Sequence, residues 1–533
     1  MELREKGYKV VSASAAAIES LAKPAVKEHH KVLLEGSGQI HDGVDDFFDT
    51  MNESTKGRLS WFFRGMKKIN HGVKRIVKES IKSSYVDTQN TLMIIEKGLS
   101  KQQDDFEQYF RENNRTVHHN WAFSKENREM IRELSDFIKD NTRELKNVPY
   151  HKIIQYFIAF GKIQKIARLR GWRLEKLELS PKLQSGLEGL NTFCKYAVGI
   201  YGKMLVNVII KKKWLKIFAS ESDEQILQTY TNTLPQHLLY SHIQSKKYLP
   251  GYAIILNPSL SAVILVIRGT MSIFDCITDI RGEYIEYTYL DPFTNNPVSK
   301  GQVHSGILTS AINLSDAIRS IILETLSNYP EYSLYICGHS LGAGTTALLS
   351  LLWLSDPEIM RKGFKSFAYA PPPVVSAELN VYLKDHLYSC VYGNDIVCRL
   401  SFGSLRDMCE MVKFWKEYDG GDCYLQACNI ASNTLYGGHI SEEILLEVYK
   451  EVRTRFVNKK LEPPGNVLQV YKEDVHKEKC LIGGEDKYLW AWVESTNYEE
   501  IVFSSSCLAD HFPNLYEDGL KWIAGEREIE SED

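Results

Sequence analysis

The pentapeptide Gly338-His339-Ser340-Leu341-Gly342 constrains the fold of this 533-residue chain more than any other feature. The apolar run 332–337 predicts a strand that leads into it, and 345–354 predicts an apolar helix that follows it. A serine between two glycines at such a strand-to-helix corner is lifted above the edge of a sheet. Glycine is needed on both sides because the sharp turn brings backbone segments too close together for side chains. The sequence therefore predicts Ser340 as a nucleophile, with Gly338, His339 and Gly342 forming its turn.

A helix that begins directly after Ser340 also favours negative charge at that point. The first N–H groups of a helix have no partner within the helix, and its dipole is positive at that end. We therefore expect the Leu341 amide to donate to an oxyanion formed on a substrate that Ser340 attacks.

A serine hydroxyl needs a histidine base and an orienting carboxylate, and both should follow it in the chain. Asp395 comes directly after the predicted strand 388–392, although it could also be an ordinary turn residue. Three histidines follow it: His439 could cap a predicted helix, and His476 lies in a charged stretch typical of a solvated loop. His511 comes after the last predicted strand and before a terminal helix. We therefore predict Asp395 as the orienting carboxylate and His511 as the base, with His439 as the alternative base.

Two patterns divide the chain. Residues 1–180 show helical periodicity with charge throughout, whereas from about residue 181 strands alternate with helices. This alternation predicts an α/β fold over 181–533, with a mostly parallel central sheet and helices on both faces. A long insertion is expected at about 401–465. The predicted strands are 252–256, 262–267, 332–337, 364–369, 388–392, 467–471 and 489–494.

The segment 56–82 of the helical accessory region carries nine Lys or Arg residues and a single acid, Glu79. Its apolar residues recur at helical spacing after Trp61, as in basic amphipathic helices that bind anionic lipid surfaces. A helix packed on the rest of the protein with a solvated basic face would give the same pattern, and Gly65 and Gly72 weaken the helix. Both interpretations stay open.

Two further apolar clusters also allow two interpretations. Ile273, Phe274, Ile277 and Ile280 have near-helical spacing, which fits a mobile amphipathic lid or a fixed surface helix. Phe414 and Trp415 lie between two lysines in the insertion, and we expect a buried aromatic pair there in preference to a surface-seeking patch.

Composition excludes several classes of function. A net charge of -4 and the lack of any zinc-finger or RNA-binding signature argue against a nucleic-acid partner. The ten cysteines have no paired Cys-x-x-Cys spacing, so we expect reduced thiols in a cytosolic environment and no metal site. The charged N-terminus is not a secretory signal, and the most apolar stretch, 196–210, falls short of the roughly 20 residues that a spanning helix needs. Any membrane contact is therefore expected from one side.

Four motifs in this order resemble the class 3 lipase family of α/β-hydrolases. They are Arg268-Gly269-Thr270 followed by Asp279, Val303-His304-Ser305-Gly306, the Ser340 pentapeptide, and the pair Asp395 and His511. The likeness spans roughly residues 190–525. It implies an α/β-hydrolase fold in which Thr270 contributes its amide and hydroxyl to the oxyanion hole beside Leu341.

Within that family the chain looks most like the diacylglycerol lipases, on segments 191–205 and 367–373 and on the long stretch between Asp395 and His511. The resemblance implies a serine-dependent lipase that cleaves the sn-1 ester of diacylglycerol at a membrane or lipid-droplet surface, without metal or cofactor. The chain departs from the animal members, which carry a four-helix membrane domain where this chain has the helical region 1–180. We therefore expect a cytoplasmic protein attached peripherally to a membrane. Protein partners are left unassigned.

Two other functions remain as alternatives. A phospholipase A1 or a broad acylglycerol esterase would use the same nucleophile, acid and base. A catalytically silent, lipase-like lipid-binding or signalling protein would keep the fold alone, but the complete set of Ser340, Asp395 and His511 argues against it.

Overall fold

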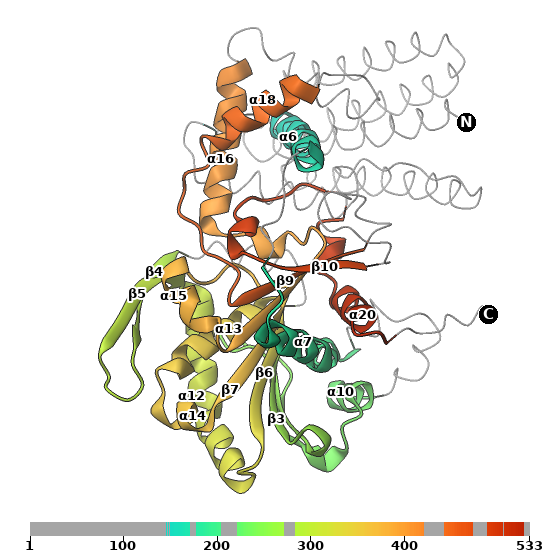
Figure 1. Cartoon of the computed structure of the whole chain (residues 1–533), viewed down its shortest axis with the longest axis vertical. Helices are drawn as coiled ribbons and strands as arrows, with labels where there is room; N and C mark the ends of the chain where they lie inside the picture. Colours follow the sequence, from blue (N-terminus) through green and yellow to red (C-terminus); the bar gives the residue numbers. More distant parts are fainter. Residues whose placement is uncertain are drawn as a thin grey trace, which may run out of the picture. The chain divides into compact units, whose positions relative to one another are not determined.

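The computed structural model describes residues 145, 148, 150–170, 177–203, 221–270, 283–419, 442–472, 488–504 and 506–526 (Figure 1). The chain forms two units, Met1–Lys162 with Val412–Ser441, and Ile163–Met411 with Glu442–Asp533. The basic segment 56–82, the predicted lid residues 273–280, Asp279, His439 and His476 lie outside the described residues.

An eight-stranded sheet organises the second unit, in the order β1-β2-β3-β6-β7-β8-β9-β10. Strands β3, β6, β7, β8 and β9 run parallel, whereas β2 pairs antiparallel with β1 and β3, and β10 pairs antiparallel with β9. The predicted mostly parallel sheet is confirmed. The strands are β1 (Leu238–His242), β2 (Tyr252–Asn257), β3 (Ala262–Ile267), β6 (Ser333–His339), β7 (Phe364–Tyr369), β8 (Leu387–Tyr392), β9 (Asn466–Lys472) and β10 (Tyr488–Val493).

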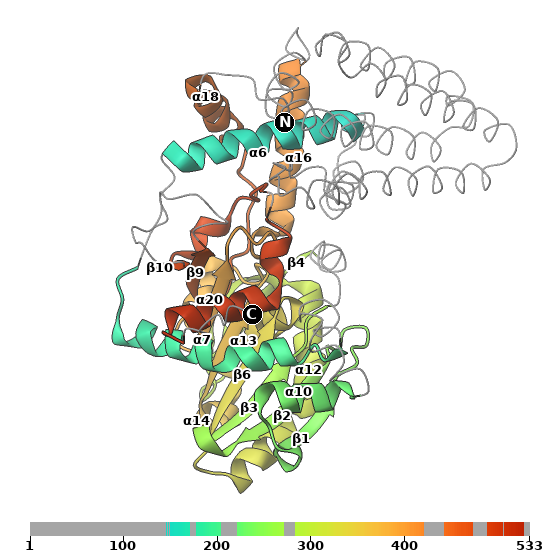
Figure 2. The same cartoon turned by 90° about the vertical axis from the view of Figure 1, so that its right-hand side faces the viewer.

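Helices cover both faces of this sheet, as Figures 1 and 2 show. One face carries α12 (Ser305–Asn328), α13 (Leu341–Leu354), α14 (Pro357–Lys362) and α15 (Ala377–Leu383). The opposite face carries α7 (Pro181–Gly199), α10 (Asp223–Thr231) and α20 (Pro513–Ile523). All six residues of β3 are buried, and alternate side chains enter the two cores, which explains its continuous apolar sequence.

Helix α7 lies against the sheet through two glycines. A Cβ atom added at Gly186 would lie 2.3 Å from the ring of Tyr388, and one at Gly189 would lie 2.2 Å from the ring of Phe367. One turn further along, Phe193 stacks on Phe367 with ring centroids 4.9 Å apart. The glycines thus make room for aromatic rings of β7 and β8, and the helix approaches the sheet closely.

Helix α12 has the length and apolar composition of a membrane-spanning helix, and among the described residues it alone meets both criteria. Its apolar stripe, which includes Leu308, Leu314 and Ile318, is buried in the core that it shares with α13. His304 accepts a hydrogen bond from the Ile307 amide at 3.2 Å and so caps its first turn.

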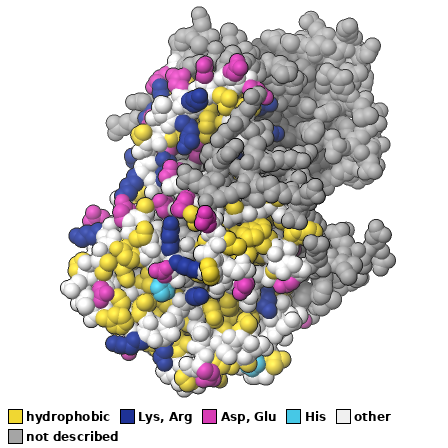
Figure 3. Space-filling model, viewed as in Figure 1, with side chains coloured by type: hydrophobic (Ala, Val, Ile, Leu, Met, Phe, Trp, Pro, Cys, Tyr) yellow, Lys and Arg dark blue, Asp and Glu magenta, His cyan; other side chains and the backbone are white. Residues whose placement is uncertain are grey.

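A hairpin of β4 (Tyr284–Leu290) and β5 (Pro297–His304) forms a separate two-stranded sheet that the sequence analysis did not predict. Asp291 closes its turn by accepting hydrogen bonds from the amides of Phe293 and Thr294. Ile285, Phe293 and Val298 of the hairpin expose 39–62% of their surface. Figure 3, drawn in the orientation of Figure 1, shows hydrophobic side chains mixed with charged ones on the described surface that faces the viewer.

The described parts of the insertion contain two helices, α16 (Phe402–Asp419) and α18 (Glu442–Arg453). In the first unit, Phe414 and Trp415 are buried, and Trp415 stacks on Tyr156 of α6 (Tyr150–Arg170) with centroids 6.1 Å apart. The buried-pair interpretation of these two aromatic residues is therefore correct.

Candidate active site

The turn between β6 and α13 holds Ser340 in an unusual backbone conformation, with φ 60° and ψ −127°. Such values cost a residue with a side chain of order 1–3 kcal/mol and persist only where the surroundings enforce them. The enforcing contacts are backbone hydrogen bonds: the Ser340 amide donates to Tyr369 O at 2.9 Å, and the amides of Ala343 and Gly344 donate to Ser340 O at 2.9 and 3.0 Å.

The two glycines of this turn are required by close backbone contacts. A Cβ atom added at Gly342 would lie 2.3 Å from Ile267 O, and one at Gly338 would lie 2.6 Å from the backbone of Gly342. Real Cβ atoms do not approach backbone atoms so closely, so larger residues would push β3, β6 and α13 apart.

The structure brings together Ser340, His511 and Asp395, which the sequence analysis selected from positions far apart in the chain. Ser340 Oγ lies 2.8 Å from His511 Nε2, and His511 Nδ1 lies 2.8 Å from Asp395 Oδ2. All three residues are buried, with exposures of 2%, 5% and 0%. This chain of hydrogen bonds connects a hydroxyl, an imidazole and a carboxylate in the order that proton transfer from serine requires.

Asp395 is fixed by two further donors. The Val397 amide donates to Oδ1 at 2.9 Å, and the Tyr516 hydroxyl donates to Oδ2 at 2.5 Å. Burial, followed by the charge of Asp395, raises the pKa of Tyr516 well above its usual value, so its hydroxyl stays protonated and remains a donor. The sequence analysis missed Tyr516, which lies on α20 beyond His511.

His339 contacts the backbone of His511. Its Nε2 lies 3.0 Å from the His511 carbonyl oxygen and its Nδ1 lies 2.9 Å from the Tyr201 hydroxyl. Because a carbonyl only accepts, Nε2 carries the proton and Nδ1 accepts from Tyr201. Burial, and then the nearby His511, holds the pKa of His339 well below its usual 6.5, which keeps the ring neutral. Tyr201 was also missed as a site residue.

The predicted oxyanion donors lie on either side of the turn. Leu341 is the first residue of α13, directly after Ser340. Thr270 comes three residues after the end of β3 and directly after Gly269, where an added Cβ atom would lie 2.4 Å from His339 O and 3.1 Å from Ser340 Cβ. The segment that leads into Thr270 is therefore in contact with the serine turn.

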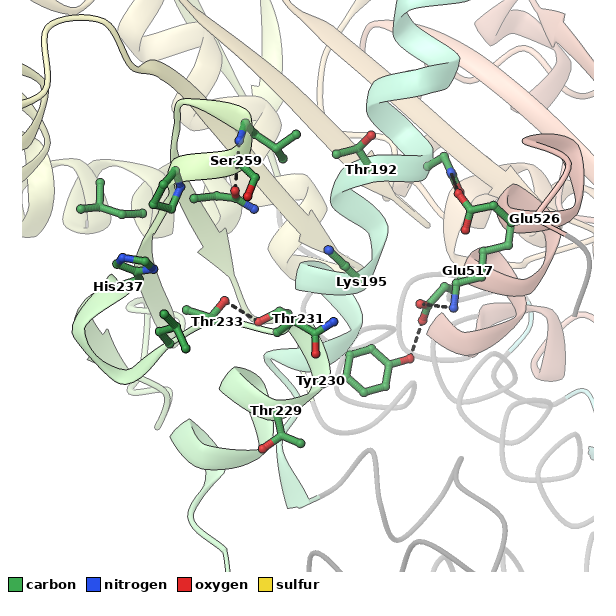
Figure 4. Close-up of a pocket in the computed structure, with 18 of the residues that line it drawn as sticks. Thr192, Lys195, Thr229, Tyr230, Thr231, Thr233, His237, Ser259, Glu517 and Glu526 are labelled. Atoms are coloured by element: carbon green, nitrogen blue, oxygen red, sulfur yellow. Dashed lines mark hydrogen bonds and ion pairs between the residues drawn. The ribbon is translucent and has the colours of Figure 1, made fainter.

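A cavity of about 1440 Å³ lies elsewhere, between α7, α10 and α20, and its lining includes none of Ser340, Asp395 and His511 (Figure 4). Its walls are polar and bonded to one another: Tyr230 donates to Glu517, which also pairs with Lys521 at 2.8 Å. Across the described ranges, no group of three potential metal ligands occurs, and the six cysteines there are free and buried.

Comparison with known proteins finds likenesses to lipases. Residues 264–404 match the model described as lipase (class 3). Diacylglycerol lipase-beta of Mus musculus is 25% identical over 57% of this chain and 48% of its own length. Diacylglycerol lipase-alpha of Homo sapiens is 23% identical over 54% of this chain and 28% of its own length. The chain thus spans about half or less of the length of these relatives.

A solved structure gives a further match. The triacylglyceride lipase of Rhizomucor miehei is 18% identical, with a TM-score of 0.30, over 42% of this chain and 76% of that one. The likeness to class 3 lipases rests on the sequence matches, and the α/β architecture on the sheet and helices described above. Residues 264–404 accordingly match the class 3 lipase model, in a chain that is similar to the diacylglycerol lipases.

Proposed function

We propose that this protein is a serine-dependent lipase that hydrolyses a fatty-acyl ester of a glycerolipid. One observation carries the proposal: the continuous hydrogen-bonded chain from Ser340 Oγ through His511 to Asp395, with 2.8 Å at each step. The class 3 lipase match over the segment that holds Ser340 and Asp395 supports the same chemistry.

In the proposed reaction, Ser340 Oγ attacks the ester carbonyl while His511 Nε2 takes its proton. Asp395 keeps the imidazole in the tautomer with the proton on Nδ1 and stabilises the imidazolium that forms. The amides of Leu341 and Thr270 donate to the tetrahedral oxyanion. His511 then protonates the leaving glycerol oxygen, and the acyl-serine is hydrolysed by a water molecule that His511 deprotonates. No cofactor is assigned to any step.

We propose the sn-1 ester of diacylglycerol as the substrate, on the strength of the two relatives that are named diacylglycerol lipases. A phospholipase A1 or a broad acylglycerol esterase would share the nucleophile and differ only in the head group that it accepts. The products that the enzyme releases distinguish a diacylglycerol lipase from these alternatives.

We further propose that the protein works at the cytoplasmic surface of a membrane or lipid droplet, to which it binds peripherally. The basic segment 56–82 supports this proposal, because its nine cations would be attracted to anionic lipid. The helical region 1–180 would then be an accessory to the hydrolase in 181–533.

The test compares purified wild-type protein with Ser340→Ala on a lipid panel. The panel holds a diacylglycerol and a phosphatidylcholine, each with different acyl chains at sn-1 and sn-2, and a triacylglycerol. We expect release of the sn-1 acid of diacylglycerol, and a loss of at least about 10⁴-fold in kcat for Ser340→Ala. Ser327→Ala, an exposed hydroxyl on α12, is the matched control and should keep full activity.

Labelling with a fluorophosphonate probe distinguishes an enzyme from a silent lipid-binding protein. Wild type and Ser327→Ala should label, and Ser340→Ala should not. A folded wild type that neither labels nor releases fatty acid would refute the proposal. Equal release from the phospholipid would refute the diacylglycerol assignment alone.

A further inference from the structure

The loops that carry Asp395 and His511 are bonded to each other by the residues that come directly before them. The Asn394 amide donates to Asp510 Oδ2 at 2.7 Å, and both side chains are buried, with exposures of 2% and 1%. A second link runs from the Ile396 amide to Cys507 O at 3.1 Å. The relative placement of the carboxylate and the imidazole therefore depends on how these two loops are held.

A residue from outside the lipase-matched segment reaches this junction. Arg168 lies near the end of α6, only 4% exposed, and its Nη1 donates to Asn394 Oδ1 at 2.8 Å. Its Nη2 lies 3.4 Å from the hydroxyl of Tyr471 on β9. The guanidinium thus connects α6 to the residue that comes directly before Asp395.

Gln164, one helical turn earlier on the same face of α6, holds the segment that leads to His511. Its Nε2 donates to Glu500 Oε1 at 2.6 Å and to Ile501 O at 2.7 Å, and its Oε1 accepts from the Phe503 amide at 3.1 Å. Gln164 is 1% exposed. These two buried polar side chains of α6 therefore bind one segment each. Arg168 binds the loop that carries Asp395, and Gln164 binds the segment that leads to His511.

The cost of burying these groups indicates that their bonds matter. A buried guanidinium or amide that loses its partner carries the full desolvation penalty, which is larger for a charged group than for a neutral one. Since α6 precedes the segment 264–404, nothing in the lipase region itself requires it. An apolar helix face would pack here without fixing the orientation of either loop.

We propose that Arg168 and Gln164 are positioning residues, through which α6 sets the alignment of His511 with Asp395. The inference rests on the proposed hydrolase function and deepens it: the helix from the N-terminal region must be seated for the site to turn over. Both residues are buried and act through Asn394 and the segment 500–503, so their loss should slow the chemical step and leave substrate binding intact. A displacement of about 1 Å at a catalytic group can cost about 100-fold in rate.

The experiment uses the full chain and measures kcat and KM separately for Arg168→Met and Gln164→Met. We expect kcat to fall by roughly 10- to 100-fold with KM unchanged within about twofold, and fluorophosphonate labelling to slow by a similar factor. Arg168→Lys keeps the charge but not the forked donor, so its kcat should lie between those of wild type and Arg168→Met. Lys165→Met, an exposed cation on the same helix, is the matched control and should behave as wild type.

Ser340→Ala and wild type are measured beside these variants, so that the two hypotheses fail separately. If wild type releases no fatty acid, the hydrolase function fails. If wild type is active and the folded Arg168→Met and Gln164→Met variants retain its kcat, the positioning role is overturned. If Arg168→Met does not fold, Arg168→Lys and Gln164→Met decide, and wild-type kcat in both overturns the proposal.

Discussion

At the scale of single residues, the sequence selected Ser340, Asp395 and His511 as candidates, and the structure places them in hydrogen-bond contact, but the sequence did not reveal the residues that hold them. Chain order and the neighbouring strands restrict the candidates for nucleophile, acid and base to a few positions. Tyr201 bonds to a residue 138 positions away, and Tyr516 bonds to one 121 positions away. Tyrosine is common in buried helices, so only the packing of α7 and α20 against the sheet reveals these partners.

His339 gives a prediction about stability and pH. Because burial holds its pKa in the folded state well below 6.5, the unfolded chain binds a proton near that pH that the folded chain does not. Stability is therefore lost as the pH falls below about 6.5, and one such group contributes about 1–2 kcal/mol between pH 7 and pH 5.

His339→Gln keeps one donor and one acceptor but does not titrate. Denaturant unfolding at pH 7 and pH 5 should show that wild type loses about 1–2 kcal/mol more than this variant. Equal losses would mean that His339 is not a neutral donor to the His511 carbonyl.

At the scale of helices and strands, local sequence predicted the elements that are buried and failed for those at the surface. The apolar run of β3 is continuous because both of its faces are covered, and the residues of β8 are likewise all buried. In β4 no side chain is fully buried, so its sequence lacks the regular alternation that marks a half-buried strand. The short edge strand β1 escaped prediction for the same reason.

Helix α7 gives a prediction at this scale. Gly186→Ala would place a methyl group 2.3 Å from the Tyr388 ring, so the helix or the ring must shift. We expect a loss of about 1–3 kcal/mol in the free energy of unfolding, although alanine is the better helix former. Ser185→Ala, on the exposed face of the same helix, should be neutral or slightly stabilising. Chemical denaturation measures both, and a Gly186→Ala variant as stable as wild type would refute the close packing of α7.

At the scale of the whole molecule, the alternation of strand and helix patterns predicted an α/β fold preceded by a helical region, and the described sheet and helices confirm the first part. It could not predict that α6 supplies Arg168 and Gln164 to the loops of the hydrolase. That connection depends on tertiary packing between segments more than 200 residues apart, for which local periodicity carries no signal.

The basic segment 56–82 gives a prediction at this scale. If it binds a lipid surface, Lys67→Gln with Lys68→Gln should weaken binding to phosphatidylserine vesicles by about 2 kcal/mol, since each cation contributes about 1 kcal/mol. Binding should also fall with added salt and be weak on phosphatidylcholine alone. Flotation assays measure this. The exposed pair Lys246→Gln with Lys247→Gln is the control, and equal effects of the two pairs would contradict a local binding segment.

The order in which the strands enter the sheet has a consequence for biosynthesis. The serine turn lies between β6 and α13, whereas His511 and Tyr516 come after β9 and β10 in the chain. A nascent chain still attached to the ribosome within α20 would therefore present its nucleophile without a base. The proposed hydrolase should thus be unable to attack the lipids around it until α20 has left the ribosome and folded.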